Sequence, residues 1–133
     1  MPVGPEELEG LARRLADKEP NEIGRRCLIS RVYYSAYHQV APLREQLPPP
    51  SDERCGMHVY LVRQLQEASN LSTFSPHLGS ALTRLGHRLD RLRRKRIKAD
   101  YKLNENVSTS QPPQVLGELE QLKEELREVD QLL

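Results

Sequence analysis

The sequence has 133 residues, of which 37% are hydrophobic and 29% charged, enough for one domain with a modest core. No apolar stretch approaches the ~18 residues that a transmembrane helix needs, and no basic segment followed by an apolar run predicts a signal peptide. The two cysteines are too few for a disulfide framework and lack the spacing of a metal site. We therefore expect one cytoplasmic domain over residues 1–133, with no membrane segment, no metal and no cofactor.

Charges of opposite sign are concentrated in different parts of the chain. The 20 Lys and Arg nearly balance the 19 Asp and Glu, so the overall charge argues neither for nor against a nucleic-acid ligand. Residues 84–102, however, contain nine Lys and Arg against two Asp, a local net charge of +7. The positive charge of the chain is therefore concentrated in residues 84–102.

The first half of the chain predicts three helices. Residues 1–20 contain an N-terminal helix, because Pro5 suits a first turn and the acidic residues after it lie near the positive end of the helix dipole. Residues 21–46 predict a long helix with Asn21 as N-cap. That helix has apolar residues on more than one face, which is typical of a central element. The stiff, polar segment "LPPPSDE" then separates it from a third helix over residues 53–68.

The second half predicts two further helices. Residues 76–103 carry an apolar stripe in steps of three and four, in which one arginine replaces an apolar residue. The stripe consists of Leu78, Leu82, Leu85, Leu89, Leu92, Arg96, Ala99 and Leu103. Residues 111–133 close the chain with an acidic amphipathic helix, expected from Val115 onward. Since no alternating pattern predicts a strand, we expect an all-α, up-and-down bundle of four to five helices, with the motif residues in core helices over residues 21–103.

Arg96 is the anomaly of the stripe. Burying an unpaired guanidinium is costly, so an inward Arg96 requires a counter-charge. Asp100, one helical turn further on, is the nearest candidate. Two interpretations are open. The stripe emerges into solvent beyond Leu92, or Arg96 and Asp100 line a cleft between two helices or two chains.

The segment "SRVYYSAYH" over residues 30–38 holds a second polar line. Arg31, Tyr34, Ser35 and His38 share one face of the predicted central helix. A carboxylate at Asp100 could pair with the guanidinium groups of both Arg31 and Arg96. The alternative is structural: a hydrogen-bonded histidine, and tyrosines packed in the core with their hydroxyl groups in water.

A basic ridge lies beside the apolar stripe. Its members step by three and four along the helix: Arg84, Arg88, Arg91, Lys95, Lys98 and Lys102. Such a ridge could follow a phosphate backbone. It could equally dock on the glutamates of the last helix, which are Glu118, Glu120, Glu124, Glu125 and Glu128. No aromatic residues are interleaved with it, which disfavours sequence-specific base recognition.

With "SRVYYSAYH", "GMHVYL" and "LDRLRRKRIKADY" in this order, the chain resembles the HEPN superfamily from about Glu22 to its end, most closely the small stand-alone bacterial and archaeal branch. The resemblance implies a helical bundle that dimerises, with functional residues of both subunits in one cleft. Many HEPN proteins are metal-independent ribonucleases of toxin–antitoxin, antiviral or CRISPR-linked defence. Their motif is an arginine followed, after four to six residues, by a histidine. The arginine stabilises charge on the scissile phosphate, and the histidine moves protons.

The chain departs from that motif. "IKADYKL" follows Arg96, so Asp100 and Tyr101 stand where the histidine would fall. A tyrosine ordinarily titrates near pH ~10 and is a poor proton shuttle at neutral pH. Arg31 and His38 have the required spacing, but on a different predicted helix. The resemblance thus implies candidate catalytic residues at Arg96, Asp100, Tyr101, Arg31 and His38, and leaves open whether the protein is an enzyme.

The resemblance also implies partners. Stand-alone HEPN proteins often pair with a small nucleotidyltransferase, which in some cases adenylylates a tyrosine beside the motif; Tyr101 is the matching position. We expect a homodimeric HEPN protein of a prokaryotic defence or toxin–antitoxin system that binds RNA or nucleotide, with metal-independent RNA cleavage an open question. One alternative is a non-catalytic assembly module in which the polar cluster fastens the second predicted helix to the fourth. Another is a general nucleic-acid clamp built on the basic ridge.

Overall fold

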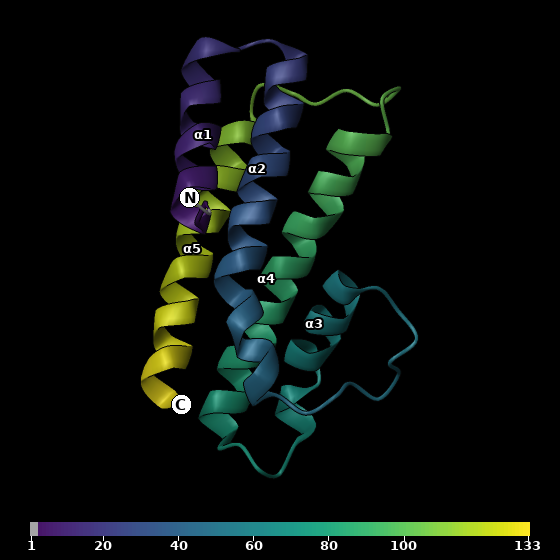
Figure 1. Ribbon diagram of the computed structural model, residues 1–133, viewed down its shortest axis with the longest axis vertical. Helices are drawn as coiled ribbons and strands as arrows, with labels where there is room; N and C mark the ends of the chain where they lie inside the picture. Colours follow the sequence, from purple (N-terminus) through teal and green to yellow (C-terminus); the bar gives the residue numbers. More distant parts are fainter. Residues whose placement is uncertain (1–2) are drawn as a thin grey trace.

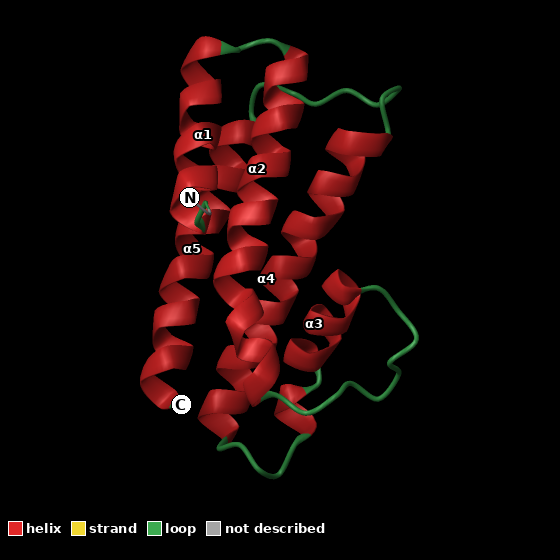
Figure 2. Ribbon diagram, in the orientation of Figure 1, coloured by secondary structure: helices red, strands yellow, loops and turns green. Residues whose placement is uncertain are grey.

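The computed structural model describes residues 3–133, which form helices and loops and contain no strand (Figures 1 and 2). The five α-helices are α1 (Pro5–Lys18), α2 (Glu22–Val40), α3 (Met57–Gln66), α4 (Pro76–Tyr101) and α5 (Gln111–Leu132), and two short 3-10 helices are η1 (Ala41–Gln46) and η2 (Ala68–Asn70). The all-α prediction is confirmed. No helix in this range is long and apolar enough to cross a membrane.

Several predicted boundaries differ from those observed; α5, for example, begins at Gln111 instead of Val115. The long helix expected over residues 21–46 ends as an α-helix at Val40 and continues as η1. Pro42 has no N–H to continue the α-helical hydrogen bonds, which accounts for the change. The third helix begins at Met57 instead of residue 53, so the connection after η1 is longer than expected.

α2 is the central helix of the bundle. It packs on α1, α4 and α5 (Figure 1), and 11 of its 19 residues are buried. The buried faces of α4 and α5 are built mostly from leucines, as the stripes predicted. The stripe of α4 continues inward past Arg96, because Ala99 is buried. Leu103, in contrast, follows the end of α4 and is 70% exposed, so the predicted stripe ends one step earlier than expected.

α3 and η2 approach α4 closely at two glycines. A Cβ atom on Gly86 would lie 2.7 Å from Cβ of Leu65, and one on Gly79 would lie 3.1 Å from Cα of Ser69. A larger residue at either position would have to push these elements apart. The two glycines therefore set how closely α3, with His58 in its first turn, sits against α4.

Arg26 fastens α2 to the C-terminal end of α4. Its guanidinium donates hydrogen bonds to four backbone carbonyl oxygens, those of Lys98 (3.2 Å), Ala99 (3.0 Å), Lys102 (3.3 Å) and Glu105. It also pairs with a carboxylate oxygen of Glu22 at 3.2 Å. The last carbonyls of a helix have no partner within the helix, and Arg26 supplies one.

Candidate functional site

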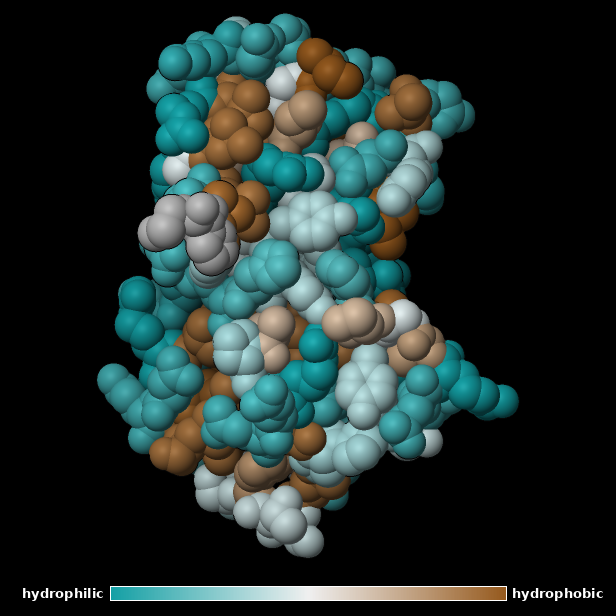
Figure 3. All heavy atoms as spheres, viewed as in Figure 1, coloured by the Kyte–Doolittle hydropathy of each residue, from teal (hydrophilic) through white to brown (hydrophobic). Residues whose placement is uncertain are grey.

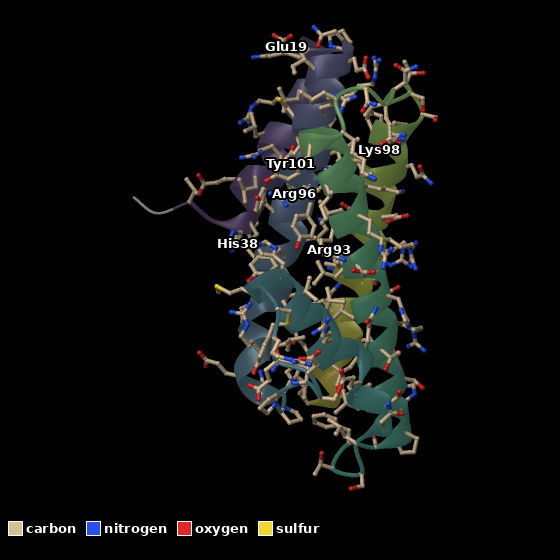
Figure 4. All side chains as sticks on the ribbon, turned by 90° about the vertical axis from the view of Figure 1, so that its right-hand side faces the viewer. Glu19, His38, Arg93, Arg96, Lys98 and Tyr101 are labelled. Carbon is tan, nitrogen blue, oxygen red and sulfur yellow. The ribbon has the colours of Figure 1, made fainter. Side chains whose placement is uncertain are left out.

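Arg96 points inward, into the seam between α2 and α4, and its side chain is 18% exposed (Figure 4). Its Nη2 donates a hydrogen bond of 2.6 Å to Oη of Tyr34 and a longer one of 3.5 Å to Oη of Tyr101. Its Cζ lies 5.1 Å from the ring centroid of Tyr34 and 5.4 Å from that of Tyr101. These are cation–π distances. The interpretation in which the end of the stripe simply faces solvent does not describe Arg96.

Asp100 is the counter-charge of Arg96. Its Oδ2 lies 3.0 Å from Nε of Arg96 and accepts a hydrogen bond of 3.2 Å from Oγ of Ser30. The contact with Nε is not aligned as a hydrogen bond, so this buried N–H has no hydrogen-bond acceptor. Burial disfavours the charged form of Arg96, but Tyr34 and Asp100 outweigh burial and raise its pKa above the ordinary value. The guanidinium therefore stays cationic and incompletely satisfied.

Asp100 pairs with Arg96 but not with Arg31, so the possibility that it pairs with both guanidinium groups is not realised. Nη2 of Arg31 donates to Oγ of Ser30 at 3.2 Å, so a hydroxyl group lies between Arg31 and Asp100. Cζ of Arg31 lies 5.3 Å from the ring centroid of Tyr34. Tyr34 is thus shared by two guanidinium groups, with a single carboxylate beside them.

The four polar residues predicted to share one face of α2 do not form a single site. Ser35 is buried and donates to the backbone oxygen of Pro5 at 2.7 Å, which joins α2 to α1. His38 is exposed and meets the edge of the Tyr37 ring, with a centroid separation of 5.3 Å. Among the described residues, no hydrogen bond or ion pair joins His38 to Arg31, so the arginine–histidine spacing on α2 does not produce a paired site. Tyr101 lies beside Arg96 and is 68% exposed.

His58 is the residue of this region that the site prediction missed. It lies in the first turn of α3, where its Nδ1 is 2.5 Å from Oη of Tyr33. Its ring stacks on Tyr37, with centroids 4.0 Å apart, and meets Tyr34 edge-on at 6.1 Å. Tyr34 therefore contacts both His58 and Arg96. The motif "GMHVYL" marked the position, but sequence spacing gave no indication that α3 would place it beside α2.

The surroundings of His58 are positively charged. Burial lowers the pKa of His58 below its ordinary value, and the charge of Arg96 lowers it further. His38, Arg44 and Arg93 act in the same direction. Such a histidine is neutral near pH 7.

Half of the basic ridge of α4 is neutralised by α5. Three of its six residues form ion pairs there: Arg84 with Glu128 (3.1 Å), Arg88 with Glu125 (2.9 Å) and Lys95 with Glu118 (3.3 Å). Lys102 lies 4.0 Å from Glu105. Arg91 is exposed and Lys98 half-buried. Docking on the acidic helix, one of the two alternatives, thus accounts for half of the ridge, and no continuous free ridge remains.

A pocket of about 340 Å³ opens beside Asp100 and Arg31. Its walls are mainly apolar and include Leu11 and Leu15 of α1 and Cys27 of α2. Within residues 3–133, no group of three His, Cys, Asp or Glu side chains is placed to hold a metal ion. Chemically, the region offers cationic and neutral hydrogen-bond donors, aromatic faces and one carboxylate, an arrangement suited to binding an anion with an attached ring.

No protein-family model matches the chain, and neither does any curated protein or solved structure. The function must therefore be inferred from the side chains around Arg96 and from the motifs of the sequence.

Proposed function

We propose that this chain is a HEPN-like bundle protein that binds RNA or a nucleotide through phosphate at the site around Arg96. The observation that carries the proposal is an excess of positive charge. The guanidinium groups of Arg31 and Arg96 share Tyr34, and Asp100 is the single carboxylate among them. The local net charge of +1 matches a phosphodiester monoanion, and planar guanidinium groups bind phosphate oxygens in pairs.

Hydrogen-bond donors remain available for that anion. Nη1 of Arg96 donates to no described residue, and only Nη2 of Arg31 donates, to Ser30. The exposed ring of Tyr101 lies beside Arg96 and offers a face on which a base can stack, as single-stranded nucleic acids do on aromatic side chains. These features support recognition of an unpaired nucleotide more than of a duplex.

We further propose that the protein acts in a prokaryotic defence or toxin–antitoxin system and pairs with a nucleotidyltransferase. The sequence resemblance supports this setting. Tyr101 is the residue proposed for modification, and two observations support it: the side chain is exposed, and its hydroxyl lies 3.5 Å from Nη2 of Arg96. A nucleotide attached to that hydroxyl would place its own phosphate against Arg96 and occlude the site.

A homodimer is proposed on the same resemblance. Ile23, near the start of α2, and Leu103, just after the end of α4, are exposed apolar residues that support it. Figure 3 shows hydrophobic side chains at the surface of that end of the bundle. Light scattering after size exclusion would test the dimer, and Ile23→Ser combined with Leu103→Ser would be expected to yield monomers. Dimers that persist in this variant would place the interface elsewhere.

RNA binding is tested by fluorescence anisotropy with a labelled single-stranded oligonucleotide. Arg96→Ala removes charge-assisted hydrogen bonds worth about 1.5–3 kcal/mol, so the affinity is expected to fall about 10- to 100-fold. Arg91→Ala is the matched control, because Arg91 is exposed on the same helix and makes no contact with the site; it should change the affinity less than about threefold. Equal losses in the two variants would show non-specific electrostatic attraction and contradict the proposed site.

The alternative is a helical assembly module without a nucleic-acid ligand. The neutralisation of the basic ridge by α5 favours it, because that surface is already occupied within the chain. It predicts no measurable RNA binding by the unaltered protein at low salt. The same anisotropy measurement therefore separates the two functions.

A further inference from the structure

Tyr33 fixes the position of the hydrogen on the His58 ring. The Tyr33 side chain is fully buried, and the only hydrogen-bond partner of its hydroxyl among residues 3–133 is Nδ1 of His58 at 2.5 Å. If Nδ1 carried a hydrogen and donated it, the phenol hydrogen would be left buried without an acceptor. A buried unsatisfied donor is strongly disfavoured. The hydroxyl of Tyr33 therefore donates, and Nδ1 accepts.

This assignment determines the chemistry of the other ring nitrogen. With Nδ1 accepting, the neutral ring carries its hydrogen on Nε2. Nε2 makes no hydrogen bond to a described residue and is not fully buried, so its N–H is accessible to a ligand. Stacking on Tyr37 and edge contact with Tyr34 hold the ring in this orientation.

Protonating the ring would break this arrangement. A hydrogen on Nδ1 would displace the one donated by Tyr33 and would add a charge to a cationic neighbourhood. The groups that face His58 are Tyr33, Tyr34, Tyr37 and His38 on α2, Arg44 on η1, and Arg93 and Arg96 on α4. Arg93 is paired with Asp90, and Arg96 with Asp100, so within residues 3–133 these two carboxylates are already engaged and do not compensate for a positive charge on the imidazole.

We propose that His58 is a neutral hydrogen-bond donor of the site, held in the Nε2–H tautomer by Tyr33, and that it binds a non-bridging phosphate oxygen beside Arg96. This role rests on the proposed function. His58 would then supply an imidazole near Arg96, although no histidine follows Arg96 in the sequence. It would not transfer protons, because Nδ1 accepts the hydrogen bond from Tyr33 and Nε2–H donates to the phosphate. Tyr33 is a positioning residue that acts through His58.

Nitrogen-15 NMR of the histidine rings in the full-length protein tests the tautomer directly. At pH 7, His58 is expected to show an unprotonated Nδ1 and a protonated Nε2, with exposed His38 as the reference in the same spectrum. In Tyr33→Phe, an Nδ1–H population should appear. A cationic His58, or a predominantly Nδ1–H form in the unaltered protein at pH 7, would overturn the proposal.

RNA binding tests the role of that donor. His58→Phe combined with Tyr33→Phe keeps the stacked ring and leaves no orphaned phenol, so the double variant should bind the oligonucleotide about fivefold more weakly than Tyr33→Phe alone. The RNA should remain intact with the unaltered protein in EDTA. Metal-independent cleavage that disappears with His58 would show proton transfer and overturn the neutral-donor role. Failure of Arg96→Ala to weaken binding would instead refute the proposed function, and the NMR result would be unaffected.

Discussion

Two arginines lie between α2 and α4, and the bundle satisfies them to different degrees. The side chain of Arg26 is 7% exposed and donates to four backbone oxygens and one carboxylate. That of Arg96 is 18% exposed, donates to two phenol oxygens and has a buried Nε without an acceptor. A guanidinium that donates mainly to backbone carbonyls holds the protein together, whereas one with donors left over could hold a ligand.

The largest expected effect is on stability, at Arg26. In Arg26→Ala the carbonyls at the end of α4 lose their charged donor, and the free energy of unfolding should fall by about 3 kcal/mol. Denaturant-induced unfolding followed by circular dichroism measures this, with Arg91→Ala as the exposed control. A loss below about 1 kcal/mol would show that Arg26 does not have the structural role assigned to it.

Asp100→Ala should have a smaller effect on stability and a different effect on binding. Asp100 is half-buried and opposes only Arg96, so we expect a loss of about 1 kcal/mol of unfolding free energy. RNA affinity should not fall, because the variant removes the carboxylate that competes with phosphate for the guanidinium. Destabilisation as large as that of Arg26→Ala would mean that Asp100 also holds α2 and α4 together.

Arg88→Ala examines the opposite face of α4. The ion pair of Arg88 with Glu125 lies between α4 and α5, where both side chains are less than one fifth exposed, and its loss should cost about 1 kcal/mol. A correspondingly small fall in unfolding free energy is expected, and it should shrink further in high salt. RNA affinity should change less than about twofold; a tenfold loss would assign phosphate binding to the ridge.

The smallest expected effect is a dependence of stability on pH. The pKa of His58 is lowered in the folded state, so the unfolded chain takes up a proton more readily and stability falls as the pH drops below the ordinary value of 6.5. Thermal unfolding at pH 7 and pH 5.5 should show this decrease, and it should be reduced in His58→Phe combined with Tyr33→Phe. An unchanged difference between the two pH values would show that other groups cause it.

Hydrophobic periodicity predicted α4 and α5 well, because each buries one face and that face is visible in the spacing of leucines, whereas α2 was recognised by apolar residues on more than one face. The pairing of Arg96 with Asp100 was also predictable, since both residues belong to one helix. The inward direction of Arg96 was one of two interpretations that the sequence left open. Arg26 escaped prediction because its acceptors are backbone carbonyls, which no side-chain pattern reveals. His58 escaped because its partners come from α2, and the rotation of one helix about another is not encoded in the spacing along either.

The close contact of α3 with α4 at Gly86 helps to set the distance between His58 on α3 and Arg96 on α4. A methyl group there would meet Leu65 at 2.7 Å and force α3 outward, and His58 would move with it. Such a substitution would touch neither His58 nor Arg96, yet it would change the distance between them. Affinity for the proposed ligand would therefore be open to mutation on α4, opposite the end of α3 that lies farther from His58, through helix spacing alone.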